Sequence, residues 1–177
     1  VPFLVGGEAA EFVDQQAAIG DRLLPAAALL GTLIFAVLWL MTGSLLLPVK
    51  AIVMNVLTVG AALGVLTLVF QDGRFEDLLG YTPNGGVEPT DFLVSAALIF
   101  ALSTDYGVFL LGRIKEARAT NDDERDAVAV GLERTGAVVT AAAILLAVAI
   151  GSFLTSSIVF IQQIGLAAAV GVLLDAF

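Results

Sequence analysis

Five long apolar stretches dominate this chain of 177 residues. They cover about residues 23–43, 51–70, 91–112, 136–154 and 158–177. A helix needs about 20 mostly apolar residues to cross a bilayer, and a helix in a soluble core is rarely so long and so uniformly apolar. The sequence therefore predicts an all-α fold, a polytopic membrane helix bundle in which residues 23–177 form the transmembrane domain.

The composition agrees with a membrane protein and argues against several other classes. Hydrophobic residues make up 59% of the chain and charged residues 14%, against about 45–50% and about 25% in soluble domains. The chain has no cysteine and no histidine, which removes disulfides, Cys/His metal sites and imidazole-based catalysis. A net charge of −9 does not suit nucleic acid. We expect no enzyme, no cofactor, no metal and no nucleic-acid partner.

The connections between the apolar stretches carry most of the charge. Residues 1–22 are expected to contain a short strand at Phe3–Val5 and an amphipathic helix that leads into the first span. Residues 71–90 are rich in Gly and Pro, which is typical of a loop. Residues 113–134 are strongly charged, and an amphipathic helix is predicted from about Asp123. This helix lies either at the membrane surface or in a solvated loop.

Basic residues predict the orientation in the membrane. With five alternating spans, most of them fall on one side, which by the positive-inside rule is the cytoplasm. The N-terminus and the 71–90 loop then face outward, and both are acidic. The basic residues of the cytoplasmic side are Lys50, Arg113, Lys115, Arg118, Arg125 and Arg134, against Arg22 and Arg74 on the other side.

Asp105 and Asp175 are ionisable residues within the apolar spans. A charged Asp at the bilayer centre costs on the order of 2.5–3.5 kcal/mol, so such a residue normally has a partner or a function. Asp105 is followed by Tyr106 and preceded by Ser103 and Thr104, whose hydroxyl groups are candidate supporting partners. Asp105 is either a proton carrier or a neutral group that bonds helices together.

Asp175 is less specific, because it lies near the end of the last span, where it either anchors the helix or takes part in transport. Gln162 and Gln163 are expected to be interfacial at the other end of that span. Small residues spaced by four predict close helix packing. They are Gly60 with Gly64, Gly165 with Ala169, and Ala167 with Gly171.

The run STDYGVFLLGRIKEAR at Ser103–Arg118 resembles the fourth span of the C-terminal half of the MmpL family, a branch of the RND (resistance–nodulation–division) transporter superfamily. The resemblance continues through AVAVGLERTGAVVTAAAILLAVAIGSF, VFIQQIGL and VLLDA. Upstream, LVGGEAAEFVDQQ resembles the end of the family's extracytoplasmic porter domain. The resemblance implies that the spans correspond to helices 8–12 of twelve, and that residues 1–22 are a porter-domain remnant.

The resemblance also implies a function. Members of the family export lipids or other hydrophobic molecules across the bacterial inner membrane, driven by the proton gradient. Their Asp-Tyr pair forms a proton relay with a matching pair on the N-terminal half, which assigns Asp105 and Tyr106 here. Ala101 and Gly107 depart from the family pattern, which often has Gly and Glu at these places. The implied partners are the bilayer, a lipid substrate and the N-terminal half; a homo-oligomer stays open.

Two other functions remain to be distinguished. The same helices could form a lipid- or sterol-sensing scaffold that does not transport, for which an intramembrane Asp-Tyr pair is unnecessary. A protein-export component of the SecDF type also uses an intramembrane Asp, but the DYGVFLLGR block fits the MmpL family better.

Overall fold

The computed structural model describes residues 6–82, 86–118 and 124–177, with only the backbone given for Tyr106 and for residues 110–111, 113–118 and 124–135. Within these residues the chain forms helices and no strand, so the predicted all-α fold is confirmed. The strand expected at Phe3–Val5 lies outside the described residues.

Among the described residues, five helices are long and apolar enough to cross a membrane, as the sequence predicts. They are α1 (Glu8–Thr42), α2 (Leu46–Leu66, extended by a π-helical turn at Thr67–Gln71), α4 (Pro89–Arg118), α5 (Glu124–Gly151) and α6 (Val159–Ala176). A short helix, α3 (Glu76–Leu79), lies between α2 and α4, and a 3₁₀ turn at Ser152–Thr155 follows α5.

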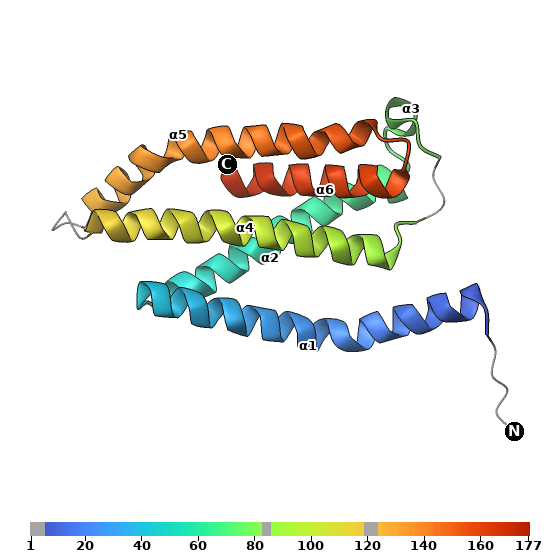
Figure 1. Ribbon diagram of the computed structural model, residues 1–177, viewed down its shortest axis with the longest axis horizontal. Helices are drawn as coiled ribbons and strands as arrows, with labels where there is room; N and C mark the ends of the chain where they lie inside the picture. The colour runs from blue at the N-terminus through green and yellow to red at the C-terminus, as the bar shows by residue number, and fades with distance from the viewer. Residues whose placement is uncertain (1–5, 83–85, 119–123) are drawn as a thin grey trace, which may run out of the picture. The chain divides into compact units, whose positions relative to one another are not determined.

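Helix α1 belongs to the first of two compact units, which covers residues 1–48. It runs unbroken through position 22, so the expected amphipathic helix and the first span form one helix. Pro25 lies inside it, and Figure 1 shows that α1 bends in its first half. Proline removes one helical hydrogen bond and is the usual cause of such a bend. The helix ends at Gly43, whose left-handed φ of 68° allows its N–H to bond the Trp39 carbonyl oxygen.

The second unit, residues 49–177, is a bundle in which α4, α5 and α6 pack against one another. Figure 1 shows α5 beside α6, with α2 crossing behind α4. Helix α5 begins at Glu124, so the helix expected from about Asp123 and the span expected from 136 form one continuous helix. Its first twelve side chains lie outside the described residues, and its predicted surface position stays a prediction.

The core of this unit joins three helices. Ala62 and Leu66 of α2, Ile99 of α4 and Ala167 of α6 are all at most 1% exposed and form one buried cluster. A second cluster, Ala143, Ala147, Ala169 and Val172, joins α5 and α6. Alanine dominates the second cluster, and small side chains of this kind let the backbones of membrane helices approach closely.

Two glycines of α6 lie against its neighbours, as the small-residue spacing predicts. A Cβ atom at Gly171 would lie 2.6 Å from the Ile99 side chain of α4. A Cβ atom at Gly165 would lie 2.7 Å from the Phe153 Cβ and 3.1 Å from the Ile150 carbonyl oxygen. For Gly60 and Gly64 the prediction stays untested, since an added Cβ meets nothing within 4 Å in the described part of the chain. Spacing alone does not tell which face of a helix meets a partner.

The end of the bundle that carries α3 is held by side chains bonded to free carbonyl groups. The Tyr81 hydroxyl lies within hydrogen-bond distance of the Val69 and Arg74 carbonyl oxygens, beyond the end of α2 where helical carbonyls lack partners. Gln162 of α6 donates through its side-chain amide to the Leu79 carbonyl oxygen at 3.1 Å and to that of Ser156 at 2.7 Å.

The expected position of Gln162 and Gln163 at the membrane interface stays a prediction, but both side chains are buried within the protein, at 3% and 4% exposed. The physical reason is visible for Gln162, because its amide connects α6 to the loop before α4 and to the turn after α5. A polar side chain near a helix end can thus be drawn inward by unpaired backbone groups.

Substitution of Gly165 or Gly171 by alanine is expected to destabilise the protein by about 1–3 kcal/mol, because the new methyl group overpacks a tight helix contact. Gly165→Ala should be the more harmful change, since a backbone carbonyl stands in its way and cannot move as a side chain can. Thermal unfolding of the purified protein in detergent measures this effect. The matched control is Gly60→Ala, which should be neutral or stabilising; equal losses in all three variants would contradict the packing described here.

Tyr81→Phe is expected to cost about 1–2 kcal/mol, because it leaves buried carbonyl oxygens without their donor. Burial, followed by the nearby Glu76, raises the pKa of Tyr81 above its usual value near 10. The unfolded chain therefore ionises first, so wild-type stability should fall as the pH rises above about 10. Tyr81→Phe lacks this loss, and the stability difference between the two proteins should shrink there. Unfolding curves at neutral and alkaline pH measure both effects.

Candidate functional site

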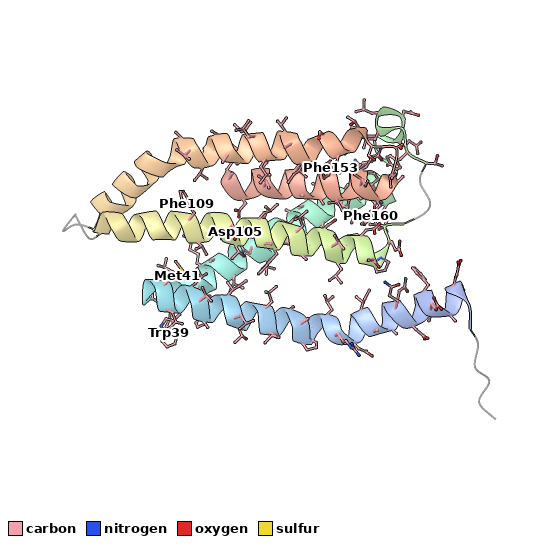
Figure 2. All side chains as sticks on the ribbon, in the orientation of Figure 1. Trp39, Met41, Asp105, Phe109, Phe153 and Phe160 are labelled. Atoms are coloured by element: carbon pink, nitrogen blue, oxygen red, sulfur yellow. The ribbon has the colours of Figure 1, made fainter. Side chains whose placement is uncertain are left out.

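Asp105 lies near the middle of α4 and its side chain is exposed (Figure 2). The sequence suggested that the hydroxyl groups of Ser103 and Thr104 support this carboxyl group. In the described part of the chain, both hydroxyl groups instead bond elsewhere. Successive side chains of a helix point about 100° apart, so sequence neighbours rarely meet. The side chain of Tyr106 lies outside the described residues.

Ser103 and Asp175 meet across two helices. Ser103 is 3% exposed, and its Oγ lies 2.5 Å from Oδ1 of Asp175 on α6. One turn earlier on each helix, Ile99 of α4 contacts Gly171 of α6. Both pairs are four residues apart on their own helix, so α4 and α6 run in parallel here and present matching faces. The contact at Gly171 thus sets the distance between the two polar side chains.

Asn55 of α2 joins the same cluster and was not singled out by the sequence. It is 6% exposed, with Oδ1 at 2.5 Å from Ser103 Oγ and Nδ2 at 3.1 Å from Thr104 Oγ1. Thr104 in turn donates to the Phe100 carbonyl oxygen at 2.8 Å. A signal existed in the sequence, because Asn55 is an amide within an otherwise apolar span and such a group requires a partner in a membrane.

The buried face of α4 carries polar residues. Asp91, Ser95 and Ser103 are 8%, 0% and 3% exposed and, together with Ile99, follow one another at intervals of four residues. Large apolar side chains of the same helix, such as Leu93 and Val94, are exposed. This arrangement reverses that of a water-soluble bundle and suits a helix whose outer surface meets lipid or another membrane helix.

Among the described residues, no group of three or more Asp, Glu, His or Cys side chains is placed to hold a metal ion. The polar cluster around Ser103 consists of carboxyl, hydroxyl and amide groups.

In the described part of the chain, five membrane-length helices and a cluster of buried polar side chains define a multi-pass membrane protein. The MMPL family model matches residues 3–177, and the chain belongs to this family, within the RND superfamily.

Several curated relatives are similar to the chain. The trehalose monomycolate exporter MmpL3 of Mycobacterium tuberculosis is 38% identical over 148 residues, which are 84% of this chain and 16% of that protein. Membrane protein SCO6666 of Streptomyces coelicolor is 43% identical over 83% of the chain and 21% of the relative. Membrane protein YdfJ of Bacillus subtilis is 32% identical over the whole chain and 24% of the relative. The chain thus spans less than a quarter of the length of these relatives.

Proposed function

We propose that this chain is the C-terminal membrane part of a proton-driven exporter of lipids or other hydrophobic molecules. The observation that carries the proposal is Asp105, a carboxyl group exposed near the middle of a helix that is long enough to cross the bilayer. A carboxyl group in that place must acquire a partner, a proton or both when the membrane surrounds it. MmpL3, to which the chain is similar, is named as an exporter of trehalose monomycolate, a lipid.

Asp105 and Tyr106 form the proton relay in this proposal, together with a matching pair on an N-terminal half of the same transporter. Because Asp105 is exposed in this chain, its side chain is free to meet such a partner. Ser103, Thr104 and Asp175 form a supporting cluster on the same helical layer. One proton that crosses a potential of 100 mV supplies about 2.3 kcal/mol, enough to bias a two-state movement of the helices.

The same proposal includes the domain bounds, the location and the orientation of the chain in the membrane. Residues 1–22 end an extracytoplasmic porter domain, residues 23–177 form the transmembrane domain, and the protein resides in the bacterial inner membrane. The N-terminus and the loop that contains α3 face outward, and residues 113–134 face the cytoplasm. The substrate binds in the porter domains or in a cavity above the bundle, and the bilayer surrounds the transmembrane domain.

Asp105→Asn is expected to abolish proton-driven export by the full-length protein, because the amide cannot take up and release a proton. Export is measured in cells at matched expression, with membrane insertion checked separately. Asp77→Asn is the matched control, since it makes the same change at an exposed position of α3 outside the spans. Undiminished export in Asp105→Asn would exclude the relay and leave the Asp105 carboxyl group with a structural role.

Single cysteines introduced at Asp77 and at Lys115 are expected to react differently with a membrane-impermeant maleimide. The site at position 77 should be labelled in intact cells, whereas that at position 115 should react only after permeabilisation, because basic segments are retained in the cytoplasm. The chain has no cysteine of its own, so labels within it report only the introduced sites. The reverse pattern would invert the proposed orientation.

A further inference from the structure

Four side chains form a continuous hydrogen-bonded series across three helices. It starts at Asp175 of α6, passes through Ser103 of α4 and Asn55 of α2, and returns to Thr104 of α4. The series ends at the Phe100 carbonyl oxygen, which accepts from Thr104. Thr104 directly precedes Asp105 in the chain, so the series connects the last helix to the segment that carries the proposed relay.

The hydrogens in this series can be counted. Ser103 Oγ lies 2.5 Å from Asp175 Oδ1 and equally 2.5 Å from Asn55 Oδ1. A serine hydroxyl has one hydrogen, whereas an amide oxygen and an ionised carboxylate only accept. If Ser103 donates to Asn55, the short contact with Asp175 requires a hydrogen on the carboxyl group. In that arrangement every donor points the same way: Asp175 to Ser103, Ser103 to Asn55, Asn55 to Thr104, and Thr104 to the backbone.

We propose that Asp175 is a second proton-binding site of the transporter, and that Asn55 is the positioning residue that transmits its protonation state to Thr104. The proposal rests on the proposed function, since it requires a cycle in which protons are taken up and released. Asp175 carries the proton in one of the two hydrogen arrangements that these distances allow, and there the series of donors from Asp175 to the Phe100 carbonyl oxygen stabilises the protonated carboxyl group.

Release of the proton reverses the series. Once the Asp175 carboxyl group has lost its hydrogen, the Ser103 hydroxyl donates to the carboxylate, a stronger charge-assisted bond. Asn55 Oδ1 then faces Ser103 Oγ with no hydrogen between them, which is repulsive. A half-turn of the Asn55 amide removes the conflict, because Nδ2 then donates to Ser103 and Oδ1 accepts from Thr104. The Thr104 hydroxyl must leave the Phe100 carbonyl oxygen, so one proton lost at Asp175 changes a hydrogen bond beside Asp105.

The described surroundings of this series contain few other titratable groups. Helices α4 and α5 pack on α6, and α2 reaches Ser103 through Asn55. On the described parts of these helices the titratable side chains are Lys50, which is exposed, Asp91, which is buried twelve residues before Ser103, and Asp105, which is exposed. Of these groups, Asp105 is the nearest to the series in the sequence, directly after Thr104.

Infrared spectroscopy of the full-length protein in liposomes at neutral pH tests the proposal without any substrate. A protonated carboxyl group gives a separate carbonyl-stretch band. This band should be present in the wild type and in Asp105→Asn, and its Asp175 component should be absent in Asp175→Asn. Asn55→Leu should shift the band although it does not contact Asp175, because Ser103 loses its own acceptor. Thr104→Val, one step further along the series, should shift it less.

Two variants separate this role from simple structural support. Ser95→Ala is the matched control, since Ser95 lies on the same buried face of α4 and its Oγ has no hydrogen-bond partner in the described part of the chain. It should leave the band unchanged. Ser103→Thr retains the hydroxyl group and should retain the band. Absence of an Asp175 band in the wild type, or a band that Asn55→Leu does not move, would overturn the proposal.

Export by the full-length protein provides the second readout. Asp175→Asn donates to Ser103 as the protonated carboxyl group does but cannot release a proton, so export should be lost although the helices still pack. Unchanged export in this variant would overturn Asp175 as a site of proton exchange. The failure of Asp105→Asn to affect export would instead overturn the proposed function, and the spectra distinguish the two outcomes because they require no transport.

Discussion

The contact between Gly171 of α6 and Ile99 of α4 determines the arrangement of the polar cluster. Since Gly171 has no side chain, Ile99 occupies the space where a Cβ would stand, 2.6 Å away. One turn further along both helices, the same approach brings Asp175 to 2.5 Å from Ser103. A larger residue at position 171 would move the helices apart and lengthen that hydrogen bond. The packing of Gly171 against Ile99 thus sets the distance between the Asp175 carboxyl group and Ser103.

The geometry of this polar cluster matters more in a membrane than it would in water. In water, an Asp or an Asn that loses its partner is solvated at little cost, but within the hydrocarbon core it has only other protein groups to bond. The cluster therefore recruits residues from three helices, and Asn55, Ser103 and Asp175 each depend on the other two. Such mutual dependence is suited to a device with two discrete hydrogen-bond arrangements, because intermediate arrangements leave polar atoms unpaired.

Much of the fold follows from the sequence. Five apolar stretches of membrane length predict five helices, and the described chain has five such helices. The apolar pattern did not predict where the helices begin. Residues 8–22 and 124–135 contain no strong helix-terminating signal, so α1 and α5 each extend well beyond the apolar stretch. The burial of Gln162 could not be predicted from the sequence either, since its side-chain amide bonds the Leu79 carbonyl oxygen, 83 positions away.

The identity of the chemical groups was determined by the sequence alone: two carboxyl groups in apolar spans, hydroxyl groups beside one of them, and no histidine, cysteine or extended basic surface. These facts, with the resemblance of Ser103–Arg118 to a transporter family, lead to the class of protein. Only the tertiary structure decided which groups meet. It assigns Ser103 and Thr104 to Asp175 and Asn55 instead of Asp105, because helical geometry turns neighbouring side chains to different faces while packing joins residues 48 to 72 positions apart.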